Sequence, residues 1–197
     1  ISLEPTSAKQ VSDDYFYNGT AMGSFTNNEI KVFAPDGAPA LAIAKYIYET
    51  GAKFGKRVTA LGGGKNNMVV MPDADLEQVA NAFIGAAYGA ASQRCMAIST
   101  LVAVGEETAD RIVQIIKEKI SALKVGVYTN PETDFGPVIS QQSKEQVLAA
   151  IDRGEAEGAV VVCDGRVADI TKKSEGFFLA PTLLDYVKPG MEIYEQE

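Results

Sequence analysis

The stretch "NMVVMPDADLEQVANAFIGAAYGAASQRCMAISTLVAV", residues 67–104, holds the pattern that decides the fold class. It begins and ends with short apolar runs, which are typical of buried strands. Between the two runs, Asp73 or Asp75 can cap a helix whose apolar positions recur every three or four residues. Strand, helix and strand in this order indicate two parallel strands joined by a crossover helix. The positions expected on the apolar face of the helix are Leu76, Val79, Phe83 and Ile84.

The same alternation extends to both sides of this stretch. Segment 39–55 has apolar residues at helical spacing and ends at Gly51 and Gly55, and a strand is predicted over 57–64. Alternation of this kind predicts an α/β fold with a mostly parallel sheet and helices on both of its faces. Further downstream, the pattern predicts helices over 106–123 and 143–158 and strands over 159–165 and 177–187.

Residues 1–39 differ in composition from the rest of the chain. They mix glycine, proline, asparagine and aromatic residues, with repeated turn signals. We interpret them as an unassigned segment of strands and loops, and we expect one domain over residues 40–197.

Composition excludes several classes of partner. The formal net charge of −8 at pH 7 argues against nucleic acid, because its phosphates would be repelled. No apolar run approaches the roughly 20 residues of a membrane-spanning helix, and no basic and apolar leader opens the sequence. Two cysteines are too few for a disulfide framework, so we expect a reducing compartment: the cytoplasm, or the mitochondrial matrix if the source is a eukaryote.

The sequence contains no histidine, which narrows the chemistry. Catalytic devices that use a serine or cysteine with a histidine cannot be built from this chain, and imidazole metal sites are excluded. Two cysteines cannot form a four-sulfur zinc site either, so we expect no metal. The catalytic groups that this chain can still offer are carboxylates, lysine, tyrosine and a cysteine thiolate.

Cys95 has two interpretations on its residues alone. A single cysteine is often a small buried hydrophobe. However, the preceding residues "GAASQR", 89–94, are small and polar, and Arg94 supplies a positive charge that favours a thiolate. Cys95 is therefore a candidate nucleophile, whereas Cys163 lies in a β-branched run and is interpreted as structural.

Two other motifs have a structural interpretation. The run "LGGGKNN", 61–67, lacks the GxxxxGK[ST] pattern of a phosphate loop, so a tight turn between strands is the simpler reading. Its glycines still allow the backbone to approach a small ligand. The acidic end "MEIYEQE", 191–197, would ordinarily be a solvated tail.

Taken together, three stretches resemble the aldehyde dehydrogenase superfamily. Within it, the likeness is greatest to the CoA-acylating methylmalonate- and malonate-semialdehyde dehydrogenases. It covers about four-fifths of the chain, from about residue 45 to the end. The stretches are "KYIYETGAKFGKRVTALGGGKNNMVVMPDADLEQVANAFIGAAYGAASQRCMAIS" (45–99), "NPETDFGPVIS" (130–140) and "EGFFLAPTLLDYVKPGMEIYEQE" (175–197).

The resemblance implies a reaction at Cys95. As the family nucleophile, it would attack an aldehyde to form a thiohemiacetal, and hydride transfer to NAD would leave a thioester on its sulfur. Hydrolytic members of the family carry a glutamate at the position of Ala60, where it activates water. Its absence implies transfer of the acyl group to coenzyme A instead.

The resemblance also implies binding roles for three residues. Leu61 matches the position whose backbone carbonyl holds the nicotinamide amide. Glu197 matches the glutamate that binds the ribose on the nicotinamide side. Arg94 matches the arginine before the cysteine, and its guanidinium could bind a substrate carboxylate or a CoA phosphate. A structural role for Arg94, pairing with a nearby carboxylate, is the alternative.

The chain also departs from the family pattern. The family usually has Gly-Glu-Arg before the cysteine, where this chain has Ser92, Gln93 and Arg94, and its FxGSTxxG turn is not found. The dinucleotide-binding domain has no counterpart, so residues 40–197 resemble part of the catalytic domain of a larger enzyme, which we expect to be a homo-oligomer. A non-catalytic binding or structural protein, or a residual thiol esterase or acyltransferase, are the alternatives.

Overall fold

The computed structural model describes residues 22–26, 29–33, 37–172 and 176–196. By its contacts the chain divides into two compact units. The first unit comprises Ile1–Gly64, Gln93–Cys95 and Glu197, and the second comprises Lys65–Ser92 and Met96–Gln196.

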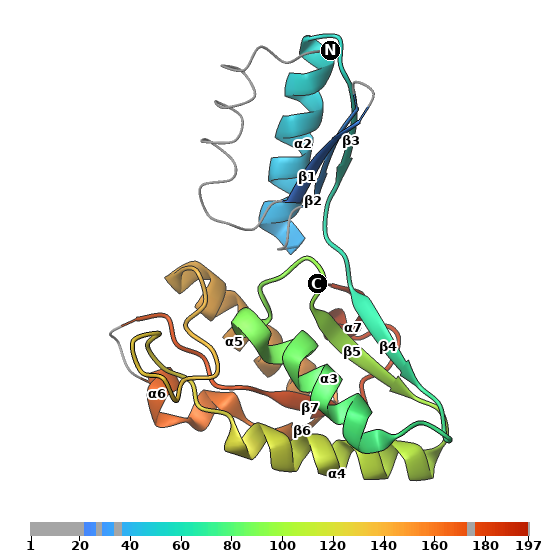
Figure 1. Ribbon diagram of the computed structural model, residues 1–197, viewed down its shortest axis with the longest axis vertical. Coiled ribbons are helices and arrows are strands. Elements are labelled where there is room, and N and C mark those ends of the chain that lie inside the picture. Colours follow the sequence, from blue (N-terminus) through green and yellow to red (C-terminus); the bar gives the residue numbers. More distant parts are fainter. Residues whose placement is uncertain (1–21, 27–28, 34–36, 173–175, 197) are drawn as a thin grey trace. The chain divides into compact units, whose positions relative to one another are not determined.

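The first unit contains a three-stranded sheet and one long helix (Figure 1). Strands β1 (Met22–Thr26) and β2 (Glu29–Phe33) are antiparallel, and β3 (Arg57–Leu61) runs parallel to β2. Helix α2 (Gly37–Lys53) connects β2 to β3, because two parallel strands cannot be joined by a tight turn.

Helix α2 buries a stripe of small and apolar residues. Ala44 and Ile47 are buried, and Gly51 follows on the same face. A Cβ atom at Gly51 would collide with the side chain of Val58 on β3, so glycine permits the close approach of helix and strand. Gly55 then has φ of +67°, the left-handed conformation that commonly follows a helix end.

The second unit contains two small sheets and the remaining helices. Strands β4 and β5 are parallel and are connected by helix α3, as the opening stretch predicts. Strands β6 and β7 are antiparallel. The elements are β4 (Asn66–Val70), α3 (Leu76–Tyr88), a short turn η1 (Gly89–Ser92), β5 (Ile98–Ala103), α4 (Glu106–Ala122), α5 (Gln141–Ala156), β6 (Val160–Cys163), η2 (Gly165–Val167), α6 (Asp169–Lys172), β7 (Leu183–Asp185) and α7 (Glu192–Glu195).

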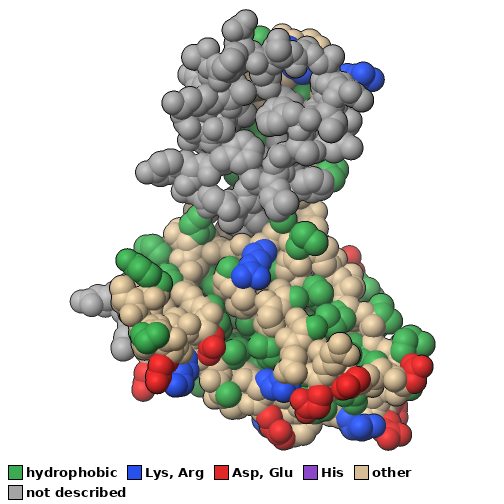
Figure 2. Space-filling view, in the orientation of Figure 1, with side chains coloured by type: hydrophobic (Ala, Val, Ile, Leu, Met, Phe, Trp, Pro, Cys, Tyr) green, Lys and Arg blue, Asp and Glu red, His purple; other side chains and the backbone are tan. Residues whose placement is uncertain are grey.

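The core of the second unit lies between the β4–β5 pair and helices α3 and α4. Val70 of β4 and Ile112 of α4 are at most 1% exposed, and Phe83 of α3 packs with them. The buried isoleucines of α4 recur every four residues, so the helix has one apolar face. Figure 2 shows charged side chains along the margin where α4 lies in Figure 1.

The mixed α/β class is confirmed, but the sheets are smaller than predicted. The described residues form three separate sheets rather than one mostly parallel sheet, and β1–β2 and β6–β7 are antiparallel. The strand predicted over 177–187 is reduced to Leu183–Asp185. Pro181 lies just before it and has no backbone N–H for a sheet ladder.

The structure describes only part of the segment 1–39. Strands β1 and β2 agree with the strands expected there, while residues 1–21, 27–28 and 34–36 lie outside the described residues. The proposed boundary between residues 39 and 40 stays a prediction. None of the helices in the described residues has the length and hydrophobicity to cross a membrane.

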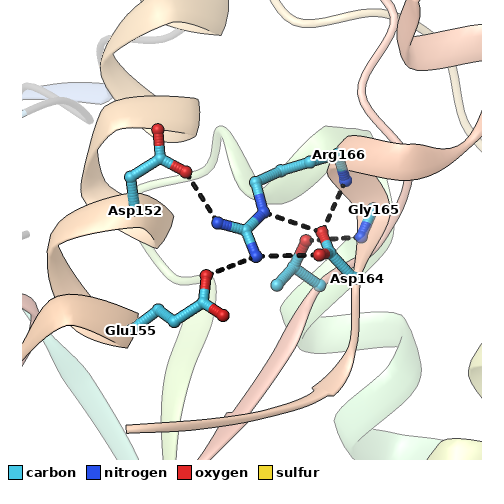
Figure 3. A network of polar contacts seen from close by, with 6 residues as sticks. Asp152, Glu155, Asp164, Gly165 and Arg166 are labelled. Atoms are coloured by element: carbon cyan, nitrogen blue, oxygen red, sulfur yellow. Dashed lines mark hydrogen bonds and ion pairs between the residues drawn. The ribbon is translucent and has the colours of Figure 1, made fainter. Parts of the chain in front are cut away.

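A charged cluster joins α5 to the end of β6 (Figure 3). Arg166 makes two side-chain hydrogen bonds to Asp164, from Nε at 2.9 Å and Nη2 at 2.8 Å. Its Nη1 lies 2.6 Å from Asp152, and Nη2 lies 2.7 Å from Glu155. One guanidinium therefore bridges three carboxylates, and the hydrogen bonds from Arg166 lower the pKa of Asp164.

This cluster predicts a loss of stability in acid. The unfolded carboxyl of Asp164 has a pKa of about 3.9, and the folded pKa is lower. The stabilisation from ionised Asp164 is therefore fully present above about pH 4 and is lost as the pH falls through the folded value. The free energy of unfolding in urea, measured from about pH 6 down to about pH 2, should show this loss. In Arg166→Leu, the loss of stability over the same pH range should be smaller. An equal acid dependence in the variant would contradict the assignment.

Candidate functional site

Cys95 lies in a turn between two elements of the second unit. The turn η1 precedes it and β5 follows, and the thiol is partly exposed. Gln93–Cys95 nevertheless group by contacts with the first unit, which also contains Leu61. The nucleophile predicted from the sequence and the residue predicted to hold the nicotinamide are thus in one compact unit.

The backbone just before Cys95 is left-handed. Ala90, Ala91 and Ser92 have φ of 52°, 51° and 65°, and all three carry a side chain. For such residues this conformation costs roughly 1–2 kcal/mol each, and strain of this kind concentrates at functional sites. The left-handed turn directs the chain from the end of α3 into the Cys95 turn.

Replacing Ser92 with glycine is expected to stabilise the protein by about 0.5–1 kcal/mol, because glycine adopts a φ of 65° without steric cost. The midpoint of thermal unfolding should rise by about 1–4 °C. The matched control is Ala82→Gly, at an exposed position inside α3, which should lower stability by about 1 kcal/mol. Destabilisation by both substitutions would show that Ser92 is not strained.

Both ends of helix α3 are fixed by side-chain contacts. The Asp75 carboxylate accepts hydrogen bonds from the backbone N–H groups of Glu77 (3.1 Å) and Gln78 (3.2 Å), so Asp75 rather than Asp73 is the cap. At the other end, the Tyr88 hydroxyl donates to the carbonyl of Thr182 at 3.0 Å. Burial raises the pKa of Tyr88 well above its ordinary value, so the hydroxyl stays protonated and keeps donating.

The strand that leaves the Cys95 turn is held by Asn66. The Nδ2 of this side chain donates to the carbonyl of Ala97, two residues after Cys95, at 2.9 Å. The register between β4 and β5 also shifts at this point, since Asn66 pairs with Ile98 and Asn67 with Thr100. Such irregularities bend a strand locally and are common next to active sites.

The other predicted site residues have different surroundings. Leu61 ends β3 and is 47% exposed, and Ala60 precedes it on the same strand, paired with Val32. Arg94 is exposed, and no carboxylate among the described residues lies within ion-pair distance of it. Glu197 lies outside the described residues.

Cys163 occupies a structural position, as predicted. It ends β6 and packs against the core of the second unit. Burial raises the pKa of its thiol, which outweighs the opposite effect of Lys117. A thiol in this state is a poor nucleophile at neutral pH.

Leu61 and Cys95 each offer an accessible polar group. Leu61 offers a backbone carbonyl at the end of a strand, and the glycines that follow it leave the backbone accessible. Cys95 offers a partly exposed thiol in the same unit. Within the described ranges, no group of three or more Cys, Asp or Glu side chains is arranged to hold a metal ion.

Three features were not foreseen from the sequence. The run "LGGGKNN" does not join paired strands, because β3 and β4 belong to different sheets. Lys65, in that run, donates hydrogen bonds to the carbonyls of Ile193 and Gln196. The acidic end is thus not a free tail but contains helix α7, which Arg153 also binds through Glu192 at 2.9 Å.

The described residues thus form mixed α/β units, and Cys95 lies in the turn between η1 and β5. The sequence model of the aldehyde dehydrogenase family matches residues 29–197, and the chain belongs to this family.

Within this family, the chain is similar to semialdehyde dehydrogenases. The chain is 47% identical over 155 residues to the malonate-semialdehyde dehydrogenase of Pseudomonas aeruginosa, covering 79% of this chain and 31% of that protein. It is 45% identical over 153 residues to the human acylating methylmalonate-semialdehyde/malonate-semialdehyde dehydrogenase of mitochondria, covering 78% and 28%. The chain therefore spans about a third of the length of these relatives.

The chain is also similar to a solved structure of such an enzyme. The chain matches a Sinorhizobium meliloti 1021 protein, assigned as a methylmalonate-semialdehyde dehydrogenase and solved in complex with NAD, with a TM-score of 0.74 and 45% identity. The match covers 79% of this chain and 32% of that one.

Proposed function

We propose that this chain carries the catalytic cysteine of an NAD-dependent, CoA-acylating dehydrogenase. Its substrate would be a small semialdehyde of the malonate or methylmalonate type, as the names of its relatives suggest. The observation that carries the proposal is the Cys95 turn, where a partly exposed thiol follows a left-handed backbone and stands next to an exposed arginine. A packed structural cysteine needs neither feature.

In the proposed reaction, the Cys95 thiolate adds to the aldehyde carbon and forms a C–S bond. When NAD is bound, it supplies the acceptor for the hydride that leaves this carbon. The thiolate of coenzyme A then attacks the resulting thioester, and the bond between the carbon and Cys95 breaks. The products are the acyl-CoA, NADH and one proton, and Cys95 returns to its starting state.

The neighbouring residues support this course in different ways. Ala60 has only a methyl group and cannot activate water, which favours CoA as the acyl acceptor. The exposed guanidinium of Arg94 can form a bidentate pair with the carboxylate of a semialdehyde acid or with a phosphate of CoA. We assign the nicotinamide amide to the Leu61 carbonyl and the ribose to Glu197.

We extend the proposal to the fold of the longer relatives. Residues 40–197 would be part of a catalytic domain whose sheet is larger, mostly parallel and covered by helices on both faces. The support is the outer face of the β4–β5 pair, where Val69 is 62% and Val102 45% exposed. Apolar strand faces of this kind are normally covered by another layer. A homo-oligomer and a reducing compartment stay part of the same proposal.

The test is the dependence of NADH formation on CoA. The protein is mixed with malonate semialdehyde and NAD, with and without CoA, and NADH and the acyl product are measured. Repeated turnover only with CoA, with acyl-CoA as product, is the expected result. Equal turnover without CoA, with a free acid as product, would mean a hydrolytic enzyme. In a separate assay, the protein is mixed with a nitrophenyl ester. Release of nitrophenol there, together with no NADH formation from the semialdehyde, would favour the thiol esterase.

A further inference from the structure

We propose that Asn66 is a positioning residue for the Cys95 nucleophile and acts on it through the backbone carbonyl of Ala97. The proposal rests on the function proposed above, because it needs Cys95 to react with the substrate. Asn66 is the first residue of β4, and no step of the proposed reaction uses its side chain.

The hydrogen bond from Asn66 reaches the chain just after Cys95. The Asn66 Nδ2 donates to the carbonyl oxygen of Ala97 at 2.9 Å, although the two residues are 31 positions apart in the sequence. Ala97 is only 8% exposed, and a buried carbonyl needs a hydrogen-bond donor. Consecutive Cα atoms are about 3.8 Å apart, so the Cα atom of Cys95 lies within about 8 Å of that of Ala97. A restraint on Ala97 therefore limits where the thiol can lie.

A bulge separates this contact from the regular pairing of β4 and β5. Asn66 pairs with Ile98. The next pair joins Asn67 to Thr100, so Ser99 is an extra residue in β5. An extra residue interrupts the hydrogen-bond ladder and bends the strand. The ladder fixes β5 beyond the bulge, and the Asn66 side chain adds a restraint ahead of it, on the side of the catalytic turn.

The other end of the segment is fixed independently of Asn66. Tyr88 is the last residue of α3, and its hydroxyl donates to the Thr182 carbonyl at 3.0 Å. The Tyr88 ring also packs edge-on against Phe83, with the ring centres 6.4 Å apart. Helix α3 thus keeps its place without Asn66. Removal of the Asn66 side chain should loosen only the residues between η1 and the start of β5.

The strained turn before Cys95 drives a displacement once this end is loosened. Ala90, Ala91 and Ser92 are left-handed, a conformation that persists only where the surrounding structure holds it. Without the hydrogen bond to Ala97, the segment can relax this strain by moving, and the thiol moves with it. A nucleophile displaced by about 1 Å can lose on the order of a hundredfold in rate.

Asn67 provides a matched control. It carries the same side chain at the next position of β4, but its Nδ2 donates to the carbonyl of Lys65 at 3.1 Å. Asn67→Ala therefore removes an equivalent amide and an equivalent hydrogen bond without affecting the contact to Ala97.

The first test is hydrogen exchange, followed by mass spectrometry, in the protein without ligands. The backbone amides of residues 93–98 should exchange about tenfold faster in Asn66→Ala than in the unsubstituted protein. Asn67→Ala should leave their exchange unchanged. If Asn66→Ala does not fold, Asn66→Asp serves instead, because an aspartate has the same size and an ionised carboxylate has no donor. Unchanged exchange over 93–98 in the folded variant would overturn the proposal.

The second test is kinetic. Asn66→Ala should lower kcat for CoA-dependent NADH formation about tenfold or more and change KM for NAD by less than about twofold, because the displaced thiol slows the chemical step. Asn67→Ala should leave both constants within about twofold. Faster exchange with an unchanged kcat would make the Asn66 contact purely structural and overturn the positioning role. Absence of NADH formation by the unsubstituted protein would instead overturn the proposed function, and the exchange result would still report on the restraint at Ala97.

Discussion

Cys95→Ala is expected to lower CoA-dependent NADH formation by at least about a thousandfold. The alanine side chain cannot form the C–S bond on which both hydride loss and acyl transfer depend. The position is partly exposed, so the substitution removes few packing contacts and should not unfold the protein. The measurement is the initial rate of NADH formation with saturating aldehyde, NAD and CoA, with the circular dichroism spectrum as the check on folding.

Cys163→Ala is the control for this prediction. It removes a thiol of the same chemistry from a packed position at the end of β6. We expect it to cost about 1 kcal/mol or more in stability while it leaves the rate within about twofold. Loss of activity in Cys163→Ala with activity retained in Cys95→Ala would contradict the assignment of the nucleophile.

Gly165→Ala is expected to destabilise the second unit by about 3 kcal/mol. Gly165 is buried at the start of η2, and its N–H donates to the Thr182 hydroxyl at 3.0 Å. An added Cβ would lie 2.6 Å from the carbonyl carbon of Ala180 and 2.8 Å from that hydroxyl. The closest neighbour is backbone, which cannot rotate away, so the connection between β6 and β7 must shift.

Thermal and urea unfolding measure this effect. The midpoint of thermal unfolding should fall by roughly 6–12 °C, since about 1 kcal/mol corresponds to 2–4 °C in a chain of this size. The matched control is Gly85→Ala on α3, where nothing lies within 4 Å of an added Cβ. That substitution should raise stability by up to about 1 kcal/mol through helix propensity. A similar small effect of both substitutions would contradict the packing described at Gly165.

The long helices could be predicted because their apolar residues repeat over several turns. The spacing of Ile112, Ile116 and Ile120 places one face of α4 in the core, and all three are buried. The face predicted for α3 was less accurate. Leu76 and Phe83 are buried, as expected. The other buried positions are Ala80 and Ala87, whereas Val79 and Ile84, which were expected there, are only partly buried. Small residues allow close packing against a neighbour that the sequence alone does not identify.

The sheets and the surroundings of the site could be predicted only in part. Apolar runs mark strands, but nothing local shows which strands pair, so the antiparallel β6–β7 pair was not foreseen. The left-handed backbone over 90–92 carries no glycine signal. The contact from Lys65 to the Gln196 carbonyl is long-range and involves a backbone acceptor, which no residue pattern reveals.

The central claim is that Cys95 carries the acyl group and passes it to coenzyme A. The most direct measurement is mass spectrometry of the protein after reaction with malonate semialdehyde and NAD in the absence of CoA. We predict an acyl group on the peptide that contains Cys95, and its rapid loss when CoA is added, with formation of acyl-CoA. No adduct at Cys95, an adduct at Cys163 instead, or loss to water as fast as to CoA would contradict the account.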